Sequence, residues 1–374
     1  MPISKIQQSS LADSAVHGQR NLIINGAMQV AQRGTSTSIT AAGSYFSPDR
    51  FEVGITATDQ LAATLSQSTT APDGFSNSLK FEVTTAETTL DADEIVTLRQ
   101  KFEGQDLQRI AKGTSSAEQV TASFWVRSSN TGTYILELYD SDNTRQVSKS
   151  YTINSANTWE YKTITFPADT TGAFDNDNNL SLFFMFWLAA GSDYTSGTLN
   201  TSWASATTAN RVVGQTNLIA STNDFYITGV QLEVGTATPF EHRLFQDEIT
   251  RCKRYYQKSF PYGTAPFNNA GQGGTRWDER TAIWPPNSFS NSTYIGAWCH
   301  LSVPMRVAPT TTQYNCNTLG TSGSYLNDVQ NSGISTSYAI TSTNHNTEKL
   351  HFYPGGIYSF GNALGVNWEA DAEL

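Results

Sequence analysis

The five histidines come first, because imidazole is the side chain that most readily exchanges protons near neutral pH. They are His17, His242, His300, His345 and His351. None has the spacing of a zinc site, and none belongs with a serine in a nucleophile-elbow motif. His242 precedes a helical pattern, where a polar contact or a helix cap is the ordinary role of such a residue. The histidines therefore predict no catalytic centre.

Paired carboxylates could hydrolyse a glycosidic bond if two of them faced a sugar at a separation of about 5–9.5 Å. The densest acidic groups lie at 91–94, 140–142 and 175–177. Each group lies between two predicted strands, where Asp and Asn are favoured because their side chains hydrogen-bond to nearby backbone. The third begins like a calcium loop (DNDNN), but Leu180 and Phe186 replace the glycine and glutamate that such a loop needs. We interpret all three groups as turns and expect no enzymatic activity.

Aromatic side chains are the remaining candidates, because their flat rings can stack on sugar rings. A Gly- and Asn-rich region holds Trp277, Trp284, Tyr294 and Trp298, and the polar segment TLNTSWASATT holds Trp203. Most tryptophans in proteins lie in a core or an interface, so ordinary packing is the alternative for each of these residues. The sequence makes these five residues the candidates for glycan binding.

Strands must position these side chains, because apolar and polar residues alternate with a period of two along much of the chain. Residues 120–126 alternate in this way, and 134–138 follow after an Asn-Thr-Gly turn. The run 182–188 is apolar on both faces, which predicts a central, fully covered strand. Residues 21–30 are predicted to form an opening strand that is split by an Asn-Gly turn.

One strand changes the parity of its apolar residues. Phe225 and Ile227 hold one parity, whereas Val230 and Leu232 hold the other. A period of two can change parity only through an extra residue. The pattern therefore predicts a β-bulge at 228–229.

A helix is predicted over roughly 242–256. There, Phe245, Ile249, Cys252 and Tyr256 recur at spacings of four, three and four residues, which places them in one apolar stripe. This stripe either packs on the sandwich of its own chain or meets two copies of itself about a threefold axis. The choice between domain packing and oligomer formation stays open at this point.

The composition agrees with β-sheets and excludes some partners. Only 15% of the 374 residues are charged, against about 25% in an average protein, and 11% are aromatic. A net charge of −10 leaves no surplus of Lys and Arg for phosphate contacts, so we predict no nucleic-acid binding. The longest apolar run, 182–190, is far too short to span a bilayer, so we also predict no membrane insertion. Three cysteines imply no disulfide framework.

These patterns predict an all-β protein of four parts. Residues 1–20 are a polar arm without the features of a signal peptide. Residues 21–240 form a β-sandwich, 241–258 a linking helix, and 259–374 a second, smaller β-sandwich.

Several segments resemble the tail-fibre and related structural proteins of tailed bacteriophages, particularly marine ones. They are NLIINGAMQVAQRGTS (21–36), PDRFEV (48–53), TGVQLEVGTATPFEHRLFQDEITRCKRYYQKS (228–259), SVPMRVAPT (302–310) and VNWEADAEL (366–374). The combination of these motifs is specific, and the first three span most of the first 259 residues. The last two suggest that the C-terminus is natural.

Three segments, 119–140, 157–166 and 224–235, are similar to the jelly-roll fold of carbohydrate-binding modules, which implies that the β-sandwich at 21–240 is a jelly roll. This resemblance implies a structural calcium ion near the first and last strands, where Asp224 is the candidate ligand. Members of that fold often carry further acidic residues at this place, whereas this chain has Phe225 and Tyr226. No other cofactor is expected.

Together the resemblances imply a virion structural protein, made in the host cytoplasm, that forms a homotrimeric tail fibre. Its arm would bind other virion proteins, and its C-terminal β-sandwich would be the receptor-binding domain for a host-surface glycan. Several weak sites on one particle would then raise avidity. The alternatives are a capsid or vertex decoration protein without a receptor role, and a glycan-degrading tailspike.

Overall fold

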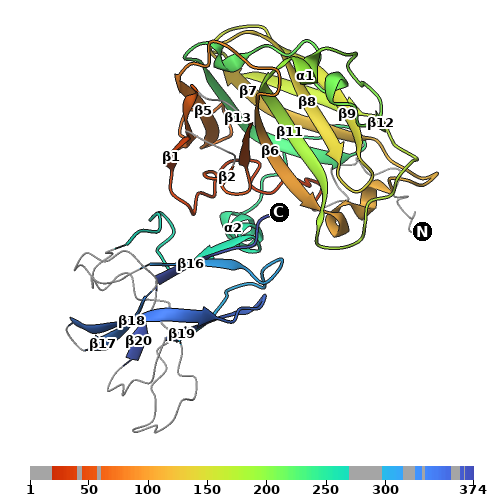
Figure 1. Ribbon diagram of the computed structural model, residues 1–374. Helices are drawn as coiled ribbons and strands as arrows, with labels where there is room; N and C mark the ends of the chain where they lie inside the picture. Colours follow the sequence, from red (N-terminus) through yellow and green to blue (C-terminus); the bar gives the residue numbers. More distant parts are fainter. Residues whose placement is uncertain are drawn as a thin grey trace, which may run out of the picture. The chain divides into compact units, whose positions relative to one another are not determined.

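The computed structural model describes residues 19–39, 44–56, 60–268, 297–314, 325–330, 333–354, 363–365 and 367–374. Their regular structure is mostly β-strand, as predicted (Figure 1). They form two compact units: the first holds 19–31, 35–248 and 374, and the second holds 32–34 and 249–373. Among the described residues, no helix is both long enough and apolar enough to cross a membrane.

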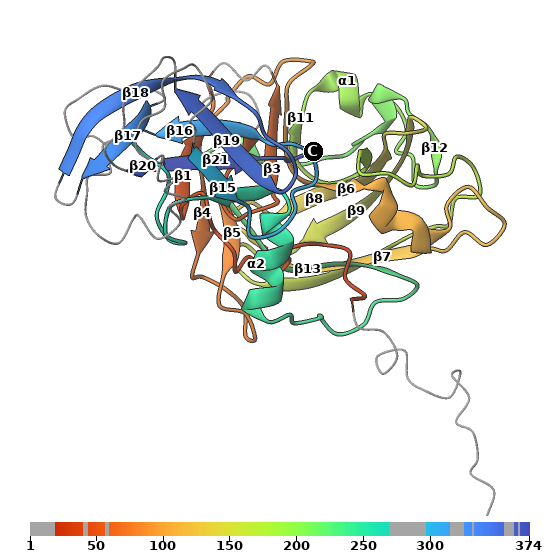
Figure 2. The same ribbon diagram turned by 90° about the horizontal axis from the view of Figure 1, so that it is seen from below.

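The first unit is a sandwich of two antiparallel sheets. Sheet A has the order β1 (Ser36–Ile39), β4 (Ala62–Ser68), β5 (Ser78–Thr85), β13 (Asp224–Val234), β7 (Val120–Ser128) and β10 (Glu160–Phe166). Sheet B has the order β12 (Ala204–Ser205), β9 (Arg145–Ile153), β8 (Gly132–Asp140), β11 (Leu180–Ala190), β6 (Ile95–Glu103), β3 (Glu52–Thr56) and β2 (Ser44–Tyr45). Figure 2 shows β7 and β13 in one layer and β6, β8 and β9 in the other.

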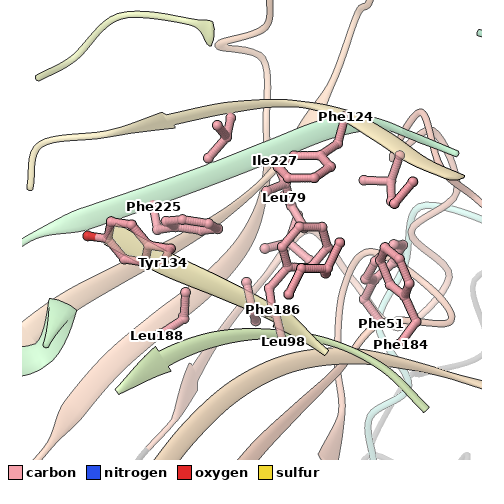
Figure 3. Close-up of a cluster of buried hydrophobic side chains, with 14 of the residues drawn as sticks. Phe51, Leu79, Leu98, Phe124, Tyr134, Phe184, Phe186, Leu188, Phe225 and Ile227 are labelled. Carbon is pink, nitrogen blue, oxygen red and sulfur yellow. The ribbon is translucent and has the colours of Figure 1, made fainter. Parts of the chain in front are cut away.

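The core lies between these sheets, because each strand turns every second side chain inward. Phe124 of sheet A meets Phe186 of sheet B edge-to-face, with ring centroids 4.9 Å apart. Figure 3 shows these rings among further buried side chains such as Leu98 and Ile227. The predicted central strand is confirmed, because β11 lies between β6 and β8 and its outward Trp187 is also fully buried.

The bulge predicted in β13 is confirmed. The pairing of β13 with β7 shifts register between Thr228 and Gln231, which brings both Ile227 and Val230 into the core. Gly229 has a φ of +60° at this point. Glycine adopts that conformation at little cost.

The predicted opening strand is wrong, although its Asn-Gly turn is present. Residues 21–31 are irregular but bury Ile23, Met28 and Val30 completely. Side chains and single backbone bonds replace a regular strand ladder: Asn21 Oδ1 accepts from the Ile23 backbone at 2.9 Å, Asn25 Nδ2 donates to the Val30 carbonyl at 2.9 Å, and the Leu22 backbone N donates to the Leu232 carbonyl at 2.8 Å. A buried segment needs such partners because unpaired backbone groups are costly.

The helix α2 (Phe245–Lys253) is shorter than the predicted one. Cys252 is buried and Ile249 is half-buried, whereas Phe245 is 45% exposed. Tyr256 is not in the helix but begins β14 (Tyr256–Lys258), where it pairs with Asp371 of another strand. The helix ends early because this pairing draws the chain into a sheet. Self-association through the stripe stays a prediction.

The second unit is a smaller β-structure, as predicted. One sheet has the order β14, β21 (Asn367–Asp371) and β16 (Thr310–Tyr314). The other has the order β15 (Ala297–His300), β19 (Lys349–Pro354), β18 (Gly333–Thr343), β17 (Tyr325–Gln330) and β20 (Ala363–Gly365). A small core surrounds the buried Met305, Phe352 and Trp368. Arg33 belongs to this unit through an ion pair of 2.9 Å with Asp371.

Candidate functional site

Three of the predicted glycan-binding residues, Trp277, Trp284 and Tyr294, lie outside the described residues. Trp298 lies on β15, where it is paired in register with His351, and only its backbone is described. Glycan binding by these four residues therefore stays a prediction.

Trp203 is half-buried and packs against the core of the first unit. Its Nε1 donates to the Pro167 carbonyl at 3.0 Å, and Lys112 Nζ lies 5.0 Å from its ring centroid. These contacts fix the ring as part of the fold. A role of Trp203 in glycan binding stays a prediction.

Asp224, the calcium candidate, is the first residue of β13. Its Oδ1 accepts from the Ser129 backbone at 3.1 Å, and its own backbone N donates to Ser129 Oγ at 2.9 Å. These bonds tie β13 to the turn that follows β7. In the part of the chain that the structure describes, no three His, Cys, Asp or Glu residues are grouped so that they could hold a metal ion.

The acidic groups that the sequence assigns to turns lie between strands, except that Asp140 is the last residue of β8, where it is buried and pairs with Lys112 at 2.5 Å. Glu94 Oε2 accepts from the Asp91 backbone at 2.7 Å, and Asp142 Oδ2 accepts from the Asp175 backbone at 3.0 Å. Asp177 likewise accepts from a backbone group two residues later, at 2.9 Å. These carboxylates stabilise local backbone, as predicted.

The structure brings together a different set of side chains on the outer face of sheet B. The strands that turn leucine and phenylalanine inward turn Glu137 and Tyr139 of β8, and Phe183 and Trp187 of β11, outward. In the register, Phe183 is paired with Tyr139. These residues are distant in sequence, and they become neighbours only because β8 and β11 are adjacent strands.

A buried ion pair lies at the centre of this face. Glu137 is fully buried and accepts from Arg211 Nε at 2.9 Å, from Arg211 Nη2 at 2.8 Å and from Trp187 Nε1 at 2.8 Å. The Arg211 guanidinium carbon lies 5.0 Å from the ring centroids of both Tyr139 and Trp187. Burial alone would lower the pKa of Arg211, but the carboxylate of Glu137 outweighs burial and raises it. Arg211 is therefore charged and held in one orientation.

Residues 191–216, which we name the cover segment, lie over part of this face. The segment contains α1 (Ser192–Thr195) and β12. Its Val212 is buried against Trp187, and Tyr194 meets Trp187 with ring centroids 5.6 Å apart. The cover segment thus supplies Arg211 and Tyr194 to a face whose other residues come from the sheet.

The cover segment buries only part of this face, and two aromatic rings on it remain half-buried. Tyr139 and Phe183 meet edge-to-face with centroids 6.0 Å apart. Arg99, on the neighbouring β6, lies 5.5 Å from the Phe183 centroid, and Lys101 Nζ lies 5.7 Å from it. We name Tyr139, Phe183, Tyr194, Arg99 and Arg211 the sheet B surface.

Two carboxylates on the outer face of sheet B, those of Glu52 and Glu137, lie far apart. Glu52 of β3 and Glu137 of β8 share one row of the sheet but lie three strands apart, or about 14 Å. Two-carboxylate hydrolysis of a glycoside needs about 5–9.5 Å. Glu52 is also held by Arg99 at 2.7 Å. Burial would raise the pKa of Glu52, but Arg99 and Lys101 hold it below its ordinary value.

Sequence reasoning missed the sheet B surface, although one signal for it was present. Tyr139 and Phe183 are aromatic residues at the outward parity of strands whose inward residues are Leu138 and Phe184. Because both faces of β11 are apolar, the pattern predicted a fully covered strand. It could not reveal that the cover segment shields this face only in part.

Comparison with known proteins finds no matching family model and no similar curated protein. Among solved structures, the enzymatically active domain of tailspike protein 4 of bacteriophage CBA120 is 15% identical, with a TM-score of 0.30, over 58% of this chain and 22% of that chain. A putative sugar binding protein from Bacteroides thetaiotaomicron is 11% identical, with a TM-score of 0.31, over 57% and 100% of the two chains. TmCBM61, in complex with β-1,4-galactotriose, is 10% identical, with a TM-score of 0.28, over 58% and 100%.

Proposed function

We propose that this chain is a glycan-binding structural protein and that the sheet B surface holds the sugar. The observation that carries the proposal is a pair of half-exposed aromatic rings, Tyr139 and Phe183, beside the fixed guanidinium of Arg211. Such rings stack on the apolar face of a sugar. Arg211 uses Nε and Nη2 to bind Glu137, and its Nη1 donates to none of the described residues. Nη1 is then the donor for a sugar hydroxyl.

The biological setting of the proposal rests on the motif resemblance in the sequence. In that setting the chain is a homotrimeric tail fibre of a tailed phage, located in the virion, and its partner is a glycan on the host surface. The N-terminal arm attaches to other virion proteins. Three copies on one fibre bind a repetitive surface together, so each single contact can be weak. No hydrolysis is part of the proposal.

A glycan array of bacterial surface polysaccharides tests the proposal, followed by calorimetry with the best-bound oligosaccharide. We expect Phe183→Ala and Tyr139→Ala each to weaken binding about tenfold or more, because truncation of a central aromatic residue removes most of its stacking area. Tyr262→Ala is the matched control, because Tyr262 is an exposed tyrosine of the second unit.

Two outcomes contradict the proposal. In one, the Phe183→Ala and Tyr139→Ala variants melt at the same temperature as the unmodified protein and bind the oligosaccharide equally well. In the other, the bound polysaccharide is shortened and new reducing ends appear, which would identify a degrading enzyme.

A further inference from the structure

The outer face of sheet A carries a second group of aromatic side chains. Trp125 of β7 and Tyr161 of β10 are paired in register, and their ring centroids lie 5.4 Å apart. Both point away from the core, because their neighbours Phe124 and Ile164 are buried between the sheets. Tyr161 is 47% exposed, and Trp125 is half-buried.

A second row of side chains adjoins this pair. The guanidinium carbon of Arg127 lies 4.7 Å from the ring centroid of Tyr226, which β13 places next to it. Trp159 meets the same tyrosine ring edge-to-face, with centroids 6.1 Å apart. The face therefore has a cation stacked on an aromatic ring. We name Trp125, Arg127, Trp159 and Tyr161 the sheet A surface.

The charge of Arg127 is not balanced by a carboxylate within the part of the chain that the structure describes. Its Nε and Nη2 donate to the backbone oxygen and Oδ1 of Asn157, each at 3.1 Å, and Asn157 is neutral. The neighbouring cation on this face, Lys80, is paired with Glu82 at 2.8 Å. In a protein with a net charge of −10, an uncompensated cation among exposed aromatic rings is a distinct chemical feature.

Stability of the fold does not account for this exposure. The hydrophobic core lies on the other side of β7 and β10, where Phe124, Ile164 and Phe166 are buried. A cross-strand aromatic pair stabilises a sheet only modestly. Contiguous exposed aromatic surface more often marks an interaction site than a packing need.

We propose that the sheet A surface binds an acidic oligosaccharide of the uronate type. The rings of Trp125 and Tyr161 stack on successive sugars, and the guanidinium of Arg127 pairs with a sugar carboxylate. The charge of Arg127 attracts the sugar carboxylate, and the ring of Tyr226 beneath it keeps the guanidinium oriented. The site lies on the other sheet from the sheet B surface and does not depend on it.

Calorimetry with an oligogalacturonate, and with the same oligomer after methyl esterification, tests the proposal. We expect the unmodified protein to bind the acidic oligomer. Its affinity should fall about tenfold or more when the oligomer is esterified, and also when the acidic oligomer is tested against Arg127→Gln or against Tyr161→Ala. Tyr161→Phe keeps the ring and should retain most of the affinity. Tyr262→Ala is the aromatic control. Higher salt should weaken binding of the acidic oligomer, because exposed charges are screened.

Four outcomes overturn the proposal. The two oligomers bind equally, or neither binds. Arg127→Gln binds the acidic oligomer as the unmodified protein does, while its melting temperature shows that it is folded. Phe183→Ala abolishes binding and Tyr161→Ala does not, which would place the ligand on sheet B. Light scattering shows that Tyr161→Ala splits an oligomer into monomers, which would make this face a contact between copies of the chain.

Discussion

The buried ammonium of Lys112 allows the sharpest test of what stabilises the first unit. Its Nζ lies 2.5 Å from Asp140 Oδ2, 3.2 Å from Asp169 Oδ2 and 2.6 Å from the Gly172 carbonyl. The side chains of Lys112 and Asp140 are 2% and 0% exposed. Lys112→Met keeps the length of the side chain but leaves the carboxylate of Asp140 without its cation. Removing one partner of a buried pair costs about 3–5 kcal/mol, because the other charge stays buried.

Lys162→Met is the matched control. Lys162 Nζ lies 2.6 Å from Glu160, almost the same distance as in the buried pair, but each of these two side chains is 15% exposed. A pair near the surface contributes about 0–1 kcal/mol. The difference between the two variants therefore reflects burial and the additional partners of Lys112, and not the length of the ion pair.

The assay is urea unfolding followed by tryptophan fluorescence, with the transition of the first unit fitted separately. We expect Lys112→Met to lower the free energy of unfolding several times more than Lys162→Met does, with an unchanged denaturant slope. In Lys112→Met combined with Asp140→Asn, part of the loss should be recovered, because the buried charge is gone. Equal losses in the two single variants, or no recovery in the double variant, would refute the reasoning.

Three further predictions concern pH, backbone and assembly. Burial, with a smaller contribution from His345, lowers the pKa of His351 to about 4. Because His351 takes up a proton more readily when unfolded, a lower pH favours the unfolded state. The second unit should have its full free energy of unfolding above about pH 6.5 and lose up to about 3 kcal/mol of it as the pH falls to 4. Equal urea midpoints at pH 7.5 and 4 would contradict this. Gly229→Ala places a Cβ at a φ of +60° and 2.6 Å from the Phe75 ring, so it should cost about 1 kcal/mol, whereas an unchanged midpoint would show that the bulge tolerates a side chain. Light scattering should give a mass near three times 40.9 kDa, and a stable monomer would count against a trimeric fibre.

The strand pattern predicted the parts of the fold that depend on neighbours in sequence. The two-residue period of a strand determines which side chains share a face. The core positions of β7, β8 and β11 and the bulge in β13 follow from this period. The same reasoning failed for residues 21–31, where a cluster of apolar residues suggested a strand. Their backbone is held instead by side chains such as those of Asn21 and Asn25 and by single backbone bonds to distant residues such as Leu232, and no local pattern signals that arrangement.

For the helix α2, too, the sequence predicted what depends on local spacing but not what depends on distant residues. The apolar spacing located it correctly near 245, but it could not tell that Tyr256 joins a sheet. The strand partner of Tyr256 is Asp371, which is 115 residues away in the chain.

The sequence by itself determined that this chain builds β-sandwiches, since alternation, few charges and many aromatic residues are properties of each strand alone. Only the tertiary structure decided which outward side chains meet. Glu137 and Arg211 are 74 residues apart, and a buried carboxylate bound by a distant arginine has no signature in either local sequence. Likewise, Tyr139 and Phe183 are only half-buried because the cover segment shields this face in part. The alternation of apolar and polar residues indicates on which face of the sheet a residue lies, but long-range packing decides whether that face is covered.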